Sequence, residues 1–75
     1  MKNKNKIFYA LYEIIRNEQG ETIQENNVND FDNLQQLANY LQKPIGTIKA
    51  ANKRHSLIDS GLYFKKYMIY RFTED

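Results

Sequence analysis

Residues 34–53 read LQQLANYLQKPIGTIKAANK, and the spacing of apolar side chains in this stretch decides the predicted fold. On both sides of Pro44 apolar residues recur at intervals of three and four, as in short helices that each bury one stripe. They are Leu37, Ala38, Leu41, Ile45, Ile48 and Ala51. Ala38 supplies the small side chain needed where two crossing helices approach closely. The pattern indicates a helix-turn-helix, with Gln42 and Lys43 in the turn where glycine and an apolar residue are common.

The two helices are expected over residues 32–42 and 44–54. Asp32 can accept hydrogen bonds from the unpaired amides of the first turn. Pro44 ends the first helix and suits the first position of the second, whose amide needs no internal partner. Gly46 inside the second helix costs about 1 kcal/mol relative to alanine. Two explanations for this glycine are close approach to a DNA backbone and tight contact with the first helix.

Strands are expected on either side of the helices. Residues 7–15 read IFYALYEII, which is rich in β-branched and aromatic side chains, and turn residues ending at Gly20 follow. A short return strand is predicted over residues 21–25, followed by a loop over residues 26–30. Residues 63–72 read YFKKYMIYRF and predict a third strand.

The sequence thus predicts one α+β domain over residues 1–75, in which an antiparallel sheet of about three strands packs against the helix-turn-helix. The segment from Ser56 to Leu62 is expected to be a turn-rich connection that acts like a wing. Both faces of the strand over residues 7–15 are apolar, so helices on one face would leave the other uncovered. We therefore expect a homodimer through the sheet.

Composition excludes several classes of site. The chain has no cysteine and one histidine, so a disulfide, a thiolate zinc site and a cysteine nucleophile are excluded, and a metal site lacks ligands. No base is placed to activate Ser56 or Ser60, and the three glycines form no phosphate-binding loop. We expect no enzyme activity, no cofactor, no targeting signal, no membrane span and a cytoplasmic location.

Charge is distributed unevenly along the chain, although the net charge is only +2. Residues 13–32 carry one arginine against six carboxylates, whereas residues 43–71 carry seven lysines and arginines against Asp59. A basic region of this kind favours contact with a polyanion. Because the basic region coincides with the second predicted helix, double-stranded DNA is the expected partner.

In this interpretation the second helix enters the major groove, where base edges are distinguishable. Lys49 and Lys53 lie four residues apart and can contact guanine edges or phosphates, and Thr47 suits a phosphate oxygen. Lys43 and the basic residues of the last strand flank the helix as phosphate contacts, and His55 is expected at the surface or at a phosphate. The residues expected to bind DNA are Lys43, Thr47, Lys49, Ala50, Lys53, Arg54, Lys65, Lys66 and Arg71.

Two other partners are consistent with the sequence. Aromatic and basic residues alternate over residues 63–72 and could stack with single-stranded bases, but most of these aromatics are needed for the core of so short a chain. The acidic region over residues 13–32 suggests instead an inhibitor or adaptor that binds a basic protein, for example by imitating DNA or by opposing a host defence.

The order of elements resembles a known family. The residues that carry the resemblance are Tyr9, Tyr12, Gly20, Phe31, Leu34, Leu37, Ala38, Leu41, Ile48 and the strand Lys66-Tyr67-Met68-Ile69-Tyr70. They are similar to those of the nuclease-associated modular domains of homing nucleases and of short proteins from phages of Gram-positive bacteria. This resemblance implies DNA binding through the second helix, in a transcription regulator or accessory factor of a phage or mobile element.

Overall fold

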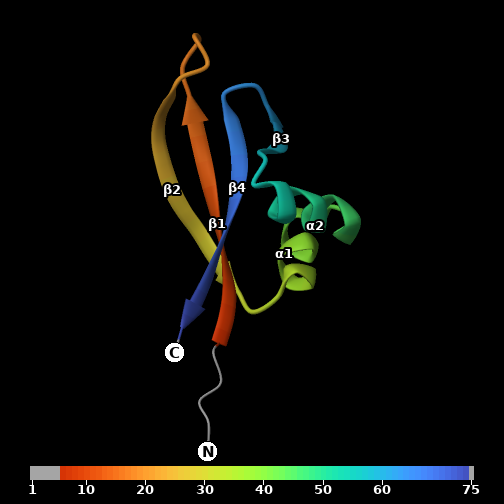
Figure 1. Cartoon of the computed structure of the whole chain (residues 1–75). Coiled ribbons are helices and arrows are strands. Elements are labelled where there is room, and N and C mark those ends of the chain that lie inside the picture. Colours follow the sequence, from red (N-terminus) through yellow and green to blue (C-terminus); the bar gives the residue numbers. More distant parts are fainter. Residues whose placement is uncertain (1–5, 75) are drawn as a thin grey trace, which may run out of the picture.

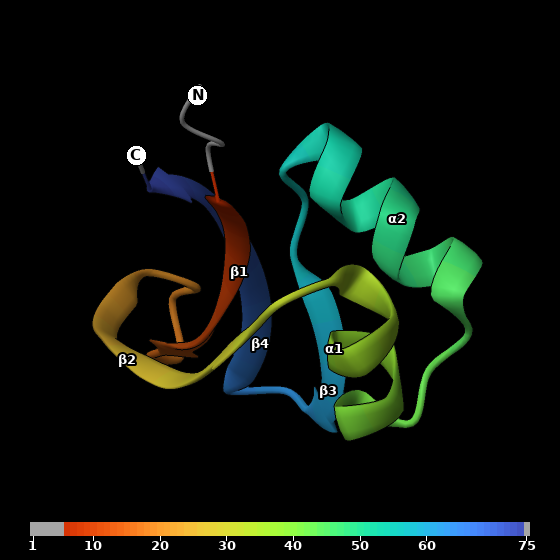
Figure 2. The ribbon, with the colours of Figure 1, turned by 90° about the horizontal axis from the view of Figure 1, so that it is seen from below.

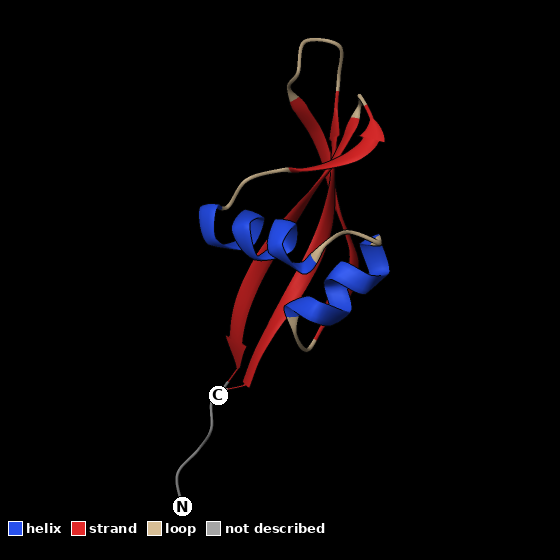
Figure 3. Ribbon diagram, turned by 90° about the vertical axis from the view of Figure 1, so that its right-hand side faces the viewer, coloured by secondary structure: helices blue, strands red, loops and turns tan. Residues whose placement is uncertain are grey.

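The computed structural model describes residues 6–74, in which four antiparallel strands form one sheet in the order β2-β1-β4-β3. The elements follow one another as β1 (Lys6–Arg16), β2 (Thr22–Phe31), α1 (Leu34–Leu41), α2 (Ile45–Arg54), β3 (Ile58–Leu62) and β4 (Lys65–Glu74). Both helices lie on the same side of the sheet, as Figure 1 and Figure 3 show. The predicted α+β class is confirmed, but the sheet has four strands where about three were expected. The basic residues Lys2 and Lys4 and the terminal Asp75 lie outside the described residues.

β1 is an inner strand because both of its faces are apolar. It pairs with β2 on one edge and with β4 on the other, and Leu11 lies opposite Ile69 of β4. Leu11 is completely buried under the helices, whereas Ala10 and Ile14 are buried on the opposite face. The strand predicted over residues 7–15 is therefore confirmed.

β2 is twice as long as predicted and includes the segment that was expected to be a loop. The turn before it is closed by the Asn17 side chain, whose Oδ1 accepts from the amides of Gln19 and Glu21, both at 3.0 Å. Leu11 lies opposite Asn29 and Tyr12 opposite Asn27, so Val28 is an extra residue in a bulge and packs against the core. Pairing with the buried β1 outweighs the low strand propensity of the asparagines.

The position predicted for the C-terminal strand was also wrong. The expected strand over residues 63–72 lies at residues 65–74, and the connection expected over residues 56–62 contains β3. Gly61 has a φ of 88°, a conformation that favours glycine, and the Ser60 hydroxyl donates to the carbonyl of Lys65. These contacts hold an Asp-Ser-Gly segment of poor strand propensity against β4.

Three of the four helix ends differ from the expected ones by one or two residues, whereas α2 ends at Arg54 as predicted. Asn33, not Asp32, caps α1, since its Oδ1 accepts from the Gln36 amide at 2.9 Å. Gln36 Oε1 in turn accepts from the Asp32 amide at 3.1 Å, in the manner of a capping box. Gln42 is the C-cap of α1 with a φ of 58°, and Pro44 is the N-cap of α2, not its first residue.

The main core lies between the helices and the sheet. Leu37 and Ala38 of α1 and Ile48 and Ala51 of α2 are buried there. They form one cluster with Leu11, Ile58 and Ile69 of the sheet. Figure 2 shows the two helices inclined to each other over this face.

Candidate nucleic-acid interface

α2 turns one apolar stripe toward the core and leaves the opposite side exposed. Ile48 and Ala51 are buried, and Ile45 is half-buried against the core. The exposed residues of the helix are Gly46, Thr47, Lys49, Lys53 and Arg54, and Ala50 is half-buried. Within residues 6–74 the cationic side of the helix is therefore open to solvent.

Gly46 lies on this open side. A Cβ atom built at Gly46 would meet no atom within 4 Å, so close contact with α1 does not explain the glycine. The other explanation drawn from the sequence, close approach to a DNA backbone, stays a prediction.

The turn between the helices is closed by local hydrogen bonds. The Lys43 amide donates to the Ala38 carbonyl at 3.0 Å, and the Gln42 amide donates to the Asn39 carbonyl at 3.2 Å. Gln42 adopts the left-handed conformation that glycine commonly supplies at such a turn. The lack of glycine in this turn therefore does not prevent the backbone from turning sharply.

Lys65 and Lys66 lie away from α2, at the start of β4. Lys65 pairs with Glu13 at 3.5 Å, and Lys66 pairs with Asp59 at 3.4 Å. Tyr67 and, to a lesser extent, Glu13 raise the pKa of Lys65, against an opposing effect of burial. Arg71 follows Lys65 by six positions along the strand, a distance of about 20 Å at the usual rise. The structure thus does not gather all the predicted cations into one surface.

Lys43 is half-buried in the turn before α2. The Gly61 amide and then Lys66 lower the pKa of Asp59, and the charge of Lys43 adds a smaller effect in the same direction. Lys43, Lys66 and Asp59 therefore influence one another on the β3 side of the molecule, where negative and positive charges offset each other.

A cleft of about 420 Å³ lies between the end of α2 and the sheet. Its lining residues are Tyr9 of β1, Asn52 and Lys53 of α2, His55 after α2, and Arg71 of β4. Lys53 and Arg71 were expected at the DNA, and His55 at the surface or a phosphate. Tyr9 and Asn52 were not expected there, because Tyr9 belongs to an apolar strand and Asn52 has no charge.

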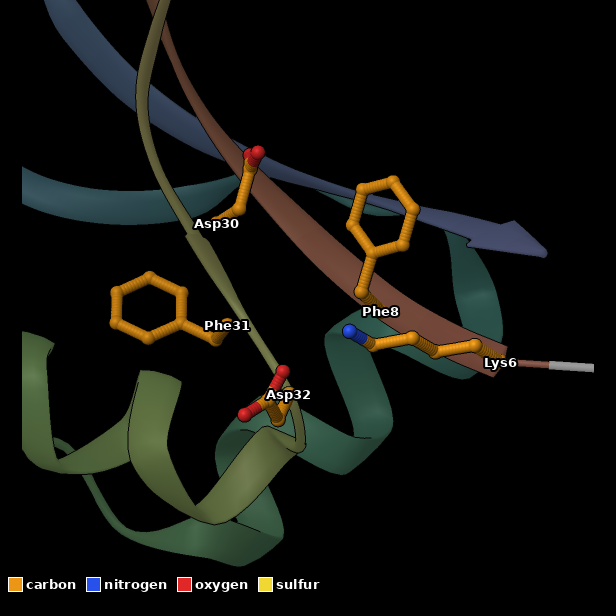
Figure 4. A pocket seen from close by; sticks show the side chains of 5 residues that line it. All are labelled: Lys6, Phe8, Asp30, Phe31 and Asp32. Carbon is orange, nitrogen blue, oxygen red and sulfur yellow. The ribbon is translucent and has the colours of Figure 1, made fainter. Parts of the chain in front are cut away.

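Two further hollows mix acids with bases. One of about 400 Å³ includes Lys49 and Asp32 in its lining, between the start of α1 and α2. The other, of about 250 Å³, is lined by Lys6, Phe8, Asp30, Phe31 and Asp32. Figure 4 shows the Lys6 side chain extending from β1 toward Asp32 across this second hollow. Both hollows combine opposite charges and so favour neither sign of ligand.

The acidic residues are spread along the β1–β2 hairpin. Glu13 is engaged by Lys65, and Glu25 accepts a hydrogen bond from the Tyr70 hydroxyl at 3.3 Å. Burial, followed by the charge of Glu25, raises the pKa of Tyr70. Glu18 and Glu21 are exposed in and beside the turn between β1 and β2. Figure 1 shows this turn at the opposite end of the sheet from the start of β1 and the end of β4.

Comparisons with known protein families, with curated proteins and with solved structures find no match to this chain. No helix among residues 6–74 is long and apolar enough to cross a membrane.

Proposed function

We propose that the chain binds double-stranded DNA, with α1 and α2 acting as a helix-turn-helix and α2 entering the major groove. The observation that carries this proposal is the exposed cationic side of α2, opposite the buried Ile48 and Ala51. A helix with one side fixed to the core and the other free is the arrangement that groove recognition requires. The protein acts by occupying DNA, without catalysis, as a regulator or accessory factor of a mobile element.

The positions of the cations limit the number of DNA phosphates that the protein is expected to contact. Lys49, Lys53 and Arg54 lie on α2, and Arg71 lies in the cleft beside it. If these four cations each neutralise one phosphate, log affinity falls against log salt with a slope of about −3.6. Recruitment of Lys65 and Lys66 as well would steepen the slope to about −5.4.

The sheet face opposite the helices supports the proposed homodimer. Phe8 and Phe72 stack there with ring centroids 5.3 Å apart, and Tyr12 and Tyr70 meet edge to face at 5.1 Å. Phe72 remains 42% exposed. A dimer through this face would cover the aromatic side chains and favour a two-fold symmetric DNA site.

The DNA proposal is tested by titrating a fluorescently labelled duplex at two salt concentrations. Lys49→Gln with Lys53→Gln is expected to weaken binding by tenfold or more, since contacts of charged groups are worth about 1.5–3 kcal/mol each. Lys65→Gln with Lys66→Gln removes the same charge from the far part of β4 and is the matched control. Equal losses in both double variants would point to nonspecific charge attraction, and absence of salt-sensitive binding by the unmodified chain would refute the proposal.

A second candidate function rests on the carboxylates of the hairpin. Five carboxylates of this region are exposed and form no ion pair within residues 6–74. They are Glu18, Glu21, Glu25, Asp30 and Asp32. They could face a basic protein, as an inhibitor or adaptor would. Capture of a host protein that survives nuclease treatment and is lost in Glu18→Lys with Glu21→Lys, but not in the α2 double variant, would favour this candidate.

A further inference from the structure

The cleft between α2 and β4 differs in chemistry from the two other hollows described above. Each of its five lining side chains carries an N–H or O–H donor, and none carries a carboxylate. The two other hollows described above both contain aspartate. The lining residues come from the C-terminal part of α2, the segment just after it, β1 and β4.

Strand register brings the two sheet residues of the cleft together. Tyr9 of β1 lies directly opposite Arg71 of β4. Leu11 follows Tyr9 by two residues in β1, and Ile69 precedes Arg71 by two residues in β4. Leu11 and Ile69 lie opposite each other and are buried beneath the helices. Because side chains alternate along a strand, Tyr9 and Arg71 share that helix-facing side.

The donors of the cleft have no acceptor within the described chain. Among the side chains of residues 6–73, none of those of Tyr9, Asn52, Lys53, His55 or Arg71 takes part in an ion pair or a side-chain hydrogen bond. Lys65 and Lys66 differ, because a carboxylate already lies beside each of them. The cleft thus concentrates donors that an external anion can satisfy.

The cleft lies at the C-terminal end of α2, where the helix dipole disfavours an anion. This effect must be compared with the attraction of an anion to Lys53 and Arg71. The C-terminus of a helix carries about half a negative charge. The amides of His55 and Ser56 both donate to the Ala51 carbonyl, and these hydrogen bonds offset part of the negative charge at the helix end. Lys53 and Arg71 carry a full positive charge each, which exceeds the partial charge of the helix end. Lys53 alone could serve only to offset the dipole, but Arg71 comes from another element.

We infer that this cleft binds a phosphate group. A guanidinium presents a planar fork of N–H donors that matches phosphate oxygens, and the Lys53 ammonium adds a second charge. The inference rests on the proposed function for the source of the phosphate, a backbone phosphodiester of DNA bound by α2. The strand would then pass from Lys49 along α2 to the cleft, away from Lys65 and Lys66.

His55 is the only histidine and therefore a unique reporter inside the cleft. The full chain, isotope-labelled at histidine, is titrated with inorganic phosphate at constant pH and ionic strength, with chloride as the balancing anion, and separately with duplex DNA. The imidazole signals are expected to shift saturably with phosphate and with duplex, but not with chloride. Arg71→Gln is expected to weaken the phosphate response about tenfold, whereas Lys66→Gln, which removes the same charge outside the cleft, leaves it unchanged.

The outcomes separate this inference from the proposed function. Duplex binding that shifts the His55 imidazole signals supports both the phosphate site and the proposed DNA binding. Duplex binding that leaves these signals unshifted overturns the phosphate site, whereas the proposed DNA binding stands. If the duplex fails to bind but phosphate still moves His55 in an Arg71-dependent way, the function fails and the cleft is a site for free phosphate. No response to either ligand, or equal responses of Arg71→Gln and the unmodified chain to phosphate, overturns the inference.

Discussion

Replacement of Gly46 tests both the packing of α2 and its proposed contact with DNA. Gly46 is the second residue of α2, and a Cβ atom built there meets nothing within 4 Å. Alanine therefore adds no clash and removes the conformational freedom of glycine from the unfolded chain. Gly46→Ala is expected to stabilise the fold by about 0.5–1 kcal/mol, which raises Tm by about 2–8 °C for a domain of this size.

The control is the same substitution at another open position. A Cβ atom at Gly61 also meets nothing within 4 Å, but the φ of Gly61 is 88°. Gly61→Ala is thus expected to destabilise the fold by about 1 kcal/mol. Thermal and urea unfolding followed by circular dichroism measure both changes. A decrease in Tm on Gly46→Ala would show that the helix surface at this position is not open, and would refute the reasoning.

A larger side chain at Gly46 tests the contact with DNA. Gly46→Leu places its side chain on the open side of α2 and should leave the fold intact. If the backbone of α2 approaches DNA at this point, leucine must displace the helix, and we expect duplex affinity to fall about tenfold, at the lower end of overpacking costs. A folded Gly46→Leu variant that binds duplex as tightly as the unmodified chain would remove Gly46 from the contact.

Four further measurements test the fold. Ile48 is fully buried, so Ile48→Ala is expected to cost about 2–5 kcal/mol in urea unfolding, and a cost below about 1 kcal/mol would mean that α2 is not docked. Asn33→Ala is expected to cost about 1 kcal/mol through loss of the helix cap, and Asp32→Ala much less; the reverse order would restore Asp32 as the cap. Because the pKa of Asp59 is lowered in the fold, its ionised form stabilises the protein above the ordinary value of 3.8, and this contribution is lost as the pH falls through the lower folded pKa. The Tm difference between the unmodified chain and Asp59→Asn should therefore be greatest near neutral pH and shrink in acid, and a difference independent of pH would contradict this assignment. Phe72→Ser is expected to convert the proposed dimer to monomer in sedimentation equilibrium, and a monomeric unmodified chain would refute the dimer.

The helices and β1 could be predicted because their signals are local. Leu37, Ile48 and Ala51 repeat at helical spacing, and the apolar run around Leu11 is long enough to identify an inner strand. The exact start of α1 was missed because Asp32 and Asn33 are both good caps. The side chain of Gln36, which returns a hydrogen bond to the Asp32 amide, favours Asn33, and this signal was already present in the sequence.

The residues that are apolar at helical or strand spacing, and the side of α2 that carries Lys49 and Lys53, could be predicted from sequence because both depend on neighbours a few residues away. Contacts between distant segments were needed to show that the Asn-rich segment before Phe31 is a strand and that the segment around Ser60 pairs with β4. Strand formation there depends on a partner distant in the sequence, and propensity alone does not reveal that partner. Pairing between β1 and β4 likewise placed Arg71 beside Tyr9 and the end of α2 while leaving Lys65 and Lys66 beside carboxylates. Which cations of the sheet lie near one another is a property of strand register.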